Sequence, residues 1–384
     1  MTNKVLKITF FFVAVSAAVL ATLCQGCTGR SAAGGDGGDT VQMRYARHIT
    51  MVRHGKYTEV TLANPWKRGA ELHRYILVDR KDSAAARALP EGTVVYTPVR
   101  RSVVFTAPHC WLLGAIGAAD AVSGVCDLAY INLARVHEQV RRGRVVDCGN
   151  SMSPSVERIV DLRPEALFVS PFDGVSYGQI DHLGVPIVEC ADYMETSALG
   201  RAEWMRFYGM LVGKEREADS LFAEVERNYH GLRTMARRVA RRPKVVTERV
   251  VSGVWYCPRG RSSMGRLLAD AGANYVFAED GRSGSLTLSP EAVVARASDA
   301  DCWMFVGAGP QPMTRSMLRS EYKGYAMLKA FGKGNVYECV PGMGNPYFEE
   351  ASFRPDWLLE CLVEIMHPEL NIKAAHRYYK RINE

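Results

Sequence analysis

This sequence of 384 residues has no large excess of charge of one sign and few long hydrophobic runs. The 48 lysines and arginines are nearly balanced by 41 aspartates and glutamates, which leaves a formal net charge of +7. A nucleic-acid-binding protein would show clustered basic stripes, so this balance argues against that class. Hydrophobic residues make up 47% and charged residues 23%, fractions that exclude a disordered tail, a collagen-like fibre and a polytopic membrane protein. The length suggests two domains or one large bilobed unit.

Signatures of catalysis and of metal binding are absent as well. The sequence holds no G-x-S-x-G elbow, no H-E-x-x-H pair and no Walker loop, which mark α/β-hydrolases, zinc proteases and nucleotide-binding enzymes. Its histidines are not spaced as metal ligands, and no His/carboxylate cluster for a bare metal ion can be assembled. We therefore expect a protein that is not an enzyme, with no catalytic residue, no metal site and no intrinsic cofactor.

One motif does favour an enzyme. Val52-Arg53-His54-Gly55 resembles the Arg-His-Gly signature of histidine phosphatases, in which the histidine is the nucleophile. The alternating residues 57–62 and the Asn64-Pro65-Trp66 turn that follow are typical of a strand and turn. No helix start follows that would hold a phosphate. A secreted phosphatase built on His54 is therefore a remote alternative.

The N-terminal residues indicate the compartment. Lys4 and Lys7 precede an apolar run from Ile8 to Leu23, and small residues follow it. A basic region, a short apolar region and a small-residue boundary are typical of a secretory signal peptide. The run is shorter than the roughly 20 residues that a membrane-spanning helix needs. We predict a signal peptide over residues 1–26.

The boundary of this signal also predicts a lipid anchor. Gly26-Cys27, with Leu23 upstream, resembles a bacterial lipobox, although Cys24 stands at the third position before Cys27. The following segment is rich in Gly and Ser, which is typical of a flexible tether, predicted over residues 27–41. We predict a lipoprotein attached through Cys27 and facing an oxidising compartment. An ordinary signal peptide with an incidental cysteine stays open.

The remaining cysteines give no recognisable motif. The only C-x-x-C is Cys24–Cys27, inside the signal, so no zinc knuckle or redox pair is left. The others lie in apolar segments, where buried thiols behave as small hydrophobic residues. One or two disulfides remain open in an oxidising compartment. These eight cysteines are Cys110, Cys126, Cys148, Cys190, Cys257, Cys302, Cys339 and Cys361.

The rest of the chain divides into an extension and two similar halves. Residues 42–99 contain short alternating or apolar runs around Pro/Gly turns, which predict a β-rich extension. Residues 100–198 and 243–384 each alternate apolar strands with helical patterns, and this rhythm predicts parallel sheets covered by helices. Between them, residues 199–242 show apolar positions at helical spacing, which predicts long connecting helices.

The two halves also repeat one short pattern. In the first, Ser153-Pro154 opens a helix with an early Glu157, and the strand 166–169 follows. In the second, Ser289-Pro290 opens a helix with Glu291, and the strand 302–306 follows. The period is far longer than that of solenoid repeats, so two related lobes are the better interpretation.

The chain resembles the substrate-binding lipoproteins of ABC importers for iron complexes, haem and vitamin B12. The resemblance rests on these paired units over residues 100–370, on Asp147–Ser153 and on the segment 199–219. The resemblance implies two Rossmann-like lobes joined by a rigid helix, with a metal chelate bound between them. It further implies a monomer in the periplasm, attached to a membrane only by its lipid, that delivers ligand to a permease and its ATPase. The extension lies outside the common pattern.

The resemblance also assigns a docking role. In these importers a glutamate near a helix start on each lobe meets arginines of the permease. Glu157 matches that position closely and Glu291 more loosely. Dipole complementation at a helix start is the alternative for both acids.

Loops that follow predicted strands are the candidate ligand contacts, because α/β sheets bind ligands at the carboxyl ends of their strands. The Trp255-Tyr256 pair suits a large flat partner, and each ring would bury ~150–250 Å². Packing of these rings in the local core is the alternative. Arg259, Arg261 and Arg282 would suit an anionic siderophore. The expected ligand-binding residues are Trp255, Tyr256, Tyr177, Arg259, Met152, His109 and Tyr347.

A second function remains open beside the importer component. A stand-alone surface lipoprotein that captures haem or a corrinoid without a permease would carry the same signal, tether and lobes. The presence of permease and ATPase genes beside this one would distinguish the two.

Overall fold

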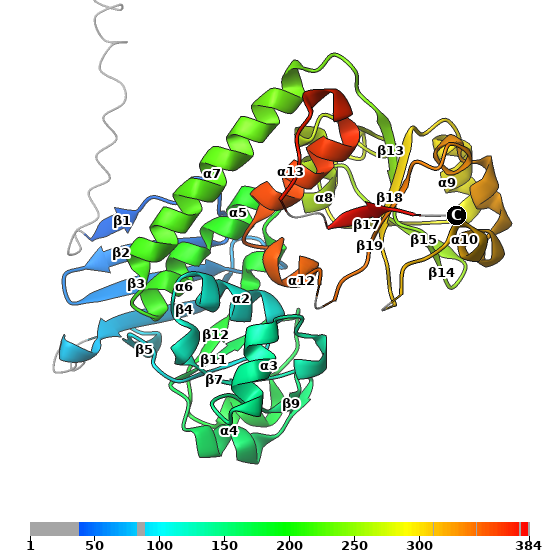
Figure 1. Ribbon diagram of the computed structural model, residues 1–384. Helices are drawn as coiled ribbons and strands as arrows, with labels where there is room; N and C mark the ends of the chain where they lie inside the picture. The colour runs from blue at the N-terminus through cyan, green and yellow to red at the C-terminus, as the bar shows by residue number, and fades with distance from the viewer. Residues whose placement is uncertain (1–37, 83–88, 310, 343, 376–377, 383–384) are drawn as a thin grey trace, which may run out of the picture. The chain divides into compact units, whose positions relative to one another are not determined.

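The computed structural model describes residues 38–82, 89–309, 311–342, 344–375 and 378–382. Within these residues the chain forms three five-stranded sheets, one three-stranded sheet and one two-stranded sheet (Figure 1). The predicted signal peptide, Cys27 and most of the predicted tether lie outside the described residues. Within the described part, no helix combines the length and apolarity needed to cross a membrane.

The β-rich extension is confirmed, and it begins at Asp39. Its strands pair in chain order, and β5 alone runs parallel to its neighbour β4. Alternate residues such as Met51, Val60 and Leu62 are fully buried, as one covered face of a sheet requires. The strands are β1 (Asp39–Val41), β2 (Ile49–His54), β3 (Tyr57–Ala63), β4 (Glu71–Asp79) and β5 (Thr93–Thr97).

The extension is tied to the helices that follow the first lobe. The fully buried carboxylate of Glu203 accepts the backbone N–H groups of residues 44, 45 and 46 at 2.7–2.8 Å. Glu195 accepts those of residues 47 and 48 at 2.8 and 2.9 Å. On β4, the Tyr75 hydroxyl donates to the carbonyl of Ile187 at 3.0 Å. These bonds make the extension an integral part of the fold.

The N-terminal lobe contains an all-parallel sheet in the order β12-β11-β6-β7-β8. Its central strand residues are buried on both faces, as the parallel arrangement predicts. Its strands are β6 (Ser102–Val104), β7 (Val122–Val125), β8 (Val146–Asp147), β11 (Ala166–Val169) and β12 (Ile187–Glu189), and its helices are α2 (Ala107–Ala115), α3 (Ala134–Arg141) and α4 (Val156–Leu162).

The start of α4 differs from the sequence prediction. Ser153-Pro154 forms the short strand β10, paired with β9 (Gly149–Asn150), and Ser155 is the N-cap, accepting the backbone N–H of Arg158 at 3.4 Å. The proline is therefore outside the helix. Glu157 still lies at the second helical position, as Glu291 does in α9 (Pro290–Ala297) behind its N-cap Ser289.

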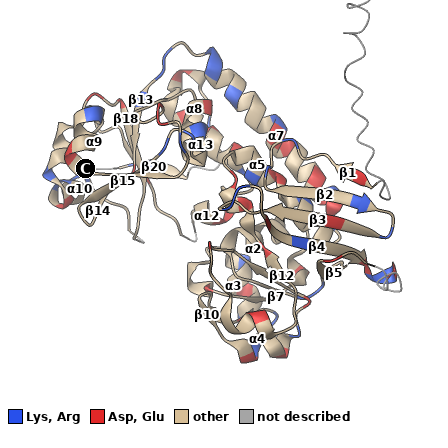
Figure 2. Cartoon of the chain, turned by 180° about the vertical axis from the view of Figure 1, so that it is seen from behind, with Lys and Arg blue, Asp and Glu red and all other residues tan. Residues whose placement is uncertain are grey.

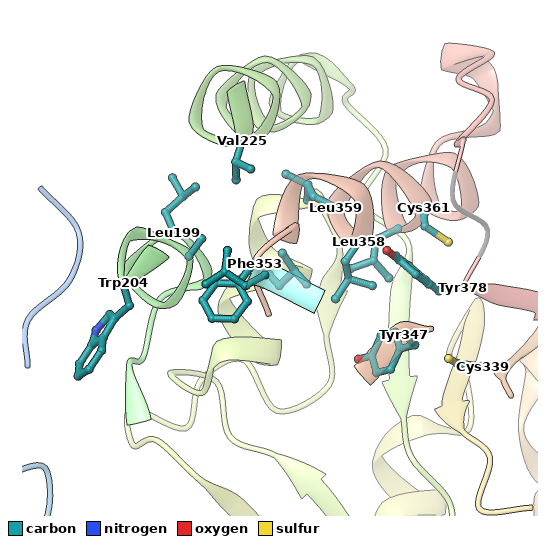
Figure 3. Close-up of a cluster of buried hydrophobic side chains, with 14 of the residues drawn as sticks. Leu199, Trp204, Val225, Cys339, Tyr347, Phe353, Leu358, Leu359, Cys361 and Tyr378 are labelled. Carbon is teal, nitrogen blue, oxygen red and sulfur yellow. The ribbon is translucent and has the colours of Figure 1, made fainter. Parts of the chain in front are cut away.

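Three helices connect the lobes, and the predicted long helix is confirmed as α7. It carries both signs of charge along its length (Figure 2) and buries one stripe that includes Val225. Figure 3 shows Leu199 of α5, Val225 of α7 and Leu358 of α13 within one buried cluster. The elements are α5 (Ala198–Glu203), α6 (Met205–Leu211), α7 (Glu215–Arg238) and, from the C-terminal lobe, α13 (Pro355–Met366).

The C-terminal lobe repeats the α/β arrangement. Its main sheet has the order β16-β13-β18-β19-β20, and only β20 is antiparallel. A small antiparallel sheet, β14-β15-β17, lies in the same lobe. The strands are β13 (Lys244–Thr247), β14 (Val250–Val251), β15 (Val254–Pro258), β16 (Asn274–Tyr275), β17 (Ser285–Leu288), β18 (Cys302–Val306), β19 (Val336–Cys339) and β20 (Tyr379–Arg381). Besides α9 and α13 its helices are α8 (Ser263–Asp270), α10 (Arg315–Glu321), α11 (Lys329–Gly332) and α12 (Tyr347–Glu350).

The cysteines behave as the composition of their segments indicates. All eight that follow Cys27 are buried free thiols. Burial raises the pKa of the Cys110 thiol to about 12, so it stays protonated and packs as a small apolar group. Among the described residues, no group of three or more His, Cys, Asp or Glu side chains is placed to hold a metal ion.

Candidate ligand-binding site

The N-terminal lobe has a pocket of about 330 Å³ at the carboxyl edge of its sheet, which we call the N-lobe pocket. Thr106 follows β6, Ser170 follows β11, and Ser151 and Met152 form the turn between β9 and β10. This edge is where α/β sheets generally bind ligands. The lining residues are Phe105, Thr106, Ser151, Met152, Val169, Ser170, Phe172, Val175, Ser176, Tyr177, Gly178 and Ile180.

Two of the expected ligand-binding residues, Met152 and Tyr177, line this pocket together. Met152 is 73% exposed, and Phe172 and Val175 beside it are each about half exposed. Exposed apolar side chains around a pocket mark a surface whose burial under a ligand or partner is favourable. Phe172 was not among the ligand-binding residues expected from the sequence.

A buried carboxylate supports Tyr177 from behind. The Tyr177 hydroxyl donates to Glu189 Oε1 at 3.0 Å. Glu189 Oε2 has no hydrogen-bond partner, and His73 Nδ1 from β4 lies 3.9 Å from it. The pKa of Glu189 is raised to about 7, mainly because its carboxyl group is buried. Sequence reasoning missed Glu189, whose only signal was an acid at the end of an apolar strand.

His109 lies behind the pocket and does not line it, which corrects its assignment as a ligand contact. It is 3% exposed, and its Nδ1 is hydrogen-bonded to the Thr106 hydroxyl. Its Nε2 lies 3.0 Å from Asp192 Oδ1, and Asp192 also accepts from Arg201 and Tyr208 at 3.0 and 2.8 Å. These partners lower the pKa of Asp192 to about 2 against the opposing effect of burial.

The C-terminal lobe has its own pocket, of about 550 Å³, at the carboxyl end of β19. Glu338 in its wall is 3% exposed and accepts the backbone N–H of Met313 at 2.7 Å, and burial raises the pKa of its carboxyl. Arg381 also lines it, but its Nε donates to the Gly334 carbonyl at 2.6 Å. The described lining is Pro312, Met313, Thr314, Glu338, Val340, Pro341, Gly342, Gly344, Asn345, Tyr378, Lys380, Arg381 and Ile382.

The interpretation of Trp255 as a ligand contact is wrong. Trp255 is fully buried, donates from Nε1 to the Thr247 carbonyl at 3.0 Å and packs edge-on against Tyr325. The predicted loop is instead strand β15, so neighbouring side chains point to opposite faces. Tyr256 therefore faces outward and is 47% exposed, which keeps its contact with ligand a prediction.

Arg259 and Tyr347 lie apart from both pockets described above. Arg259 Nη1 is paired with Asp280 at 2.7 Å, and Nε donates to the Ser285 carbonyl at 3.1 Å, so its charge is already engaged. Tyr347 is buried against Tyr378 and Tyr379 and lines a smaller pocket with residues of α5, α8 and α13. Their contact with ligand stays a prediction.

The two acids predicted to dock on the permease are exposed, and His54 is partly buried. Glu157 and Glu291 are both exposed at the second position of capped helices, and Tyr322 donates to Glu291 at 3.1 Å. His54 ends strand β2 and stacks on Tyr57 with ring centroids 4.8 Å apart. The strand predicted after this histidine is confirmed as β3.

Two lobes built on mainly parallel sheets, each with a pocket at the carboxyl edge, define an α/β ligand-binding protein. Residues 103–341 match the model of the periplasmic binding protein family. Because these residues make up more than half of the chain, the chain belongs to that family, as the sequence resemblance implied.

Individual proteins are similar to this chain over most of its length. An uncharacterized lipoprotein of Methanocaldococcus jannaschii is 24% identical over 349 residues, which cover 85% of this chain and 82% of the relative. A structure from an Fe³⁺-hydroxamate transport system of Saccharomonospora viridis has a TM-score of 0.54 at 16% identity, covering 70% of this chain and 94% of that one. A periplasmic heme-binding protein from Roseiflexus has a TM-score of 0.53 at 20% identity, covering 70% and 100%. These two structures show a shared fold.

Proposed function

We propose that this protein is the lipid-anchored substrate-binding component of an ABC importer and that its ligand is a metal chelate: a ferric siderophore, haem or a corrinoid. The family match over residues 103–341 is the observation that carries the proposal. The pocket at the carboxyl edge of each lobe's sheet supports it, because such edges bind ligands. In this role the protein binds and delivers its ligand and catalyses no reaction.

Anchoring through Cys27 is part of the proposal. The relative from Methanocaldococcus jannaschii is named a lipoprotein, and a second relative of the same organism carries the same designation. Acyl chains contribute about 0.8 kcal/mol for each buried CH₂, so several chains on Cys27 would hold the protein firmly at a membrane. In this proposal the two lobes lie in the periplasm, and the protein is a monomer attached to a membrane only by its lipid.

Native mass spectrometry tests the ligand class directly. The purified protein is exposed separately to haem, cobalamin and ferric siderophores, and each sample is examined for a one-to-one complex. We expect one class to give a stable complex with an absorbance spectrum that differs from that of the free chelate. Binding to none of them, combined with hydrolysis of phosphate esters that is lost in His54→Ala, would replace the proposal by the phosphatase alternative.

Docking on the permease gives a prediction about the two exposed acids. Glu157→Lys together with Glu291→Lys is expected to leave ligand affinity and folding intact, because both side chains are exposed and neither lines the two pockets. Truncating or reversing a charge in a docked ion pair costs about 2–5 kcal/mol. Stimulation of the importer's ATPase in proteoliposomes should therefore fall to the unstimulated rate.

A matched control reverses two exposed acids elsewhere. Glu138 on α3 and Glu369 are both about half exposed, and reversing them changes the net charge equally. This control should stimulate the ATPase normally. A double Glu157/Glu291 variant that stimulates as well as the control would leave both residues as ordinary helix-start carboxylates.

A further inference from the structure

The lining of the N-lobe pocket carries no charged side chain. Its polar side chains are five hydroxyl groups, those of Thr106, Ser151, Ser170, Ser176 and Tyr177. A hydroxyl can donate or accept toward a ligand unless its proton is already committed. The hydrogen-bond partners of these hydroxyls within the protein therefore determine whether the pocket presents donors or acceptors to a ligand.

Two of these hydroxyls donate to carboxylates. Tyr177 donates to Glu189 Oε1 at 3.0 Å, and Ser176 donates to Asp181 Oδ2 at 2.7 Å. An ionised carboxylate only accepts, so both protons are directed away from the pocket. If Glu189 takes up a proton, the free position is Oε2, which has no hydrogen-bond partner. Tyr177 then still donates to Oε1.

The Thr106 hydroxyl is engaged by His109, whose Nδ1 is hydrogen-bonded to it. The His109 Nε2 faces Asp192 Oδ1 at 3.0 Å, and a carboxylate is acceptor-only when ionised, so Nε2 carries a hydrogen. Arg201 also pairs with the buried Asp192 carboxylate at 3.0 Å.

Four backbone donors in the same wall are also engaged. The N–H of Ser151 donates to Asp127 at 3.1 Å and that of Met152 to Asn150 at 2.9 Å. The N–H of Tyr177 donates to Asp181 at 3.0 Å, and that of Gly178 donates to the Ser176 hydroxyl at 2.9 Å. The hydroxyls of Ser151 and Ser170 are the lining side chains for which no such commitment is seen.

We propose that the N-lobe pocket selects the part of a chelate that carries N–H or O–H donors or a positive charge, and that it disfavours carboxylates and other anions. Its wall offers oxygen lone pairs from Thr106, Ser176 and Tyr177, with acidic groups behind them. An anion placed there would lose its water donors, and among the lining side chains only the Ser151 and Ser170 hydroxyls could replace them. The inference rests on the proposed function and specifies its substrate class as a neutral or cationic, donor-bearing chelate.

Matched ligands test this selection in the full-length protein. Ferrioxamine B, its N-acetyl derivative and its N-succinyl derivative share one iron hydroxamate core and end in an ammonium, an amide and a carboxylate. Cobinamide and the corrinoid whose amides are hydrolysed to carboxylates form a second matched pair. Tryptophan fluorescence titration gives the dissociation constants. Within the series that binds, we expect the dissociation constant of the donor-bearing member to be at least about tenfold lower than that of the carboxylate member. One hydrogen bond to a charged group has an effect of this size.

Variants assign the preference to this pocket. Thr106→Val removes the acceptor and should weaken binding of the donor-bearing ligand about two- to tenfold, whereas Thr106→Ser should not.

In Glu189→Gln the side-chain amide can donate to the Tyr177 oxygen, which frees the Tyr177 proton to point into the pocket. The ratio between donor-bearing and carboxylate ligands should then fall by about threefold or more. Glu138→Gln removes the same charge from an exposed position on α3 and serves as control. Circular dichroism confirms that each variant folds.

Equal affinities within the series that binds, or tighter binding of its carboxylate member, overturn the inference and leave the proposed function standing. If haem, which carries two carboxylates, or a ferric tris-catecholate binds most tightly, the inference is likewise overturned and the proposed function stands. A selectivity ratio that is unchanged in both Thr106→Val and Glu189→Gln also overturns it. If no chelate binds to the wild-type protein, the proposed function fails, and this inference fails with it.

Discussion

Replacing Glu203 by alanine is expected to lower the free energy of unfolding by about 3–5 kcal/mol, because it removes the acceptor of buried backbone donors. The carboxylate is fully buried and accepts the N–H groups of Arg44, Tyr45 and Ala46. The bond from Ala46 is buried, and those from Arg44 and Tyr45 are partly buried. Urea unfolding followed by circular dichroism measures the loss.

Two further variants show where the loss arises. Glu203→Gln keeps one acceptor oxygen at the same place and should recover part of the stability. Glu217→Ala removes a carboxylate that pairs with Lys214 in the first turn of α7 and should lower the free energy of unfolding much less than Glu203→Ala does. Wild-type stability in Glu203→Ala would mean that the extension is attached independently of this residue.

The bonds to Glu203 also show what the sequence leaves undetermined. Residues 42–99 read correctly as β-rich because their apolar residues alternate, and alternation is a local property. Docking of that sheet depends on a side chain about 157 residues further along the chain. No local pattern of apolar residues reports a backbone N–H bonded to a distant carboxylate.

Trp255 and Ser155 illustrate the same limit at shorter range. Proline and glycine near Trp255 favoured a loop, whereas pairing of β15 with β17 makes a strand and turns the tryptophan into the core. Ser153-Pro154 resembled a cap, but pairing with β9 displaced the helix start by two residues to Ser155. In both places a tertiary partner outweighed the local propensity.

The candidate site was predictable by region and not by residue. The rule that ligands bind at the carboxyl ends of strands pointed to Met152 and Tyr177, and the structure brings both residues to one pocket. The groups that determine the chemistry of that pocket, Glu189 and Asp192, belong to a different strand and the segment after it. Their role follows from burial and hydrogen bonding, which become visible only in the folded chain.

Glu189 should make the stability of the protein depend on pH in an unusual direction for a carboxylate. Burial raises its pKa from 4.5 to about 7. Between these values the folded state holds a proton that the unfolded state has released, so the free energy of unfolding decreases as pH rises. A shift of this size corresponds to about 3 kcal/mol, since one pKa unit is about 1.4 kcal/mol.

Glu189→Gln removes this titration because the amide stays neutral. Asp192, whose pKa is lowered to about 2, contributes in the opposite direction and only below about pH 4, outside this window. Glu248, whose pKa burial also raises to about 7, is unchanged in the variant. Urea unfolding of both proteins at pH 5 and pH 8 should therefore show that the variant loses less stability on going to pH 8, by about 3 kcal/mol. Equal losses in the two proteins would show that Glu189 is ionised in the folded state already at pH 5, and that solvent or His73 compensates its buried charge.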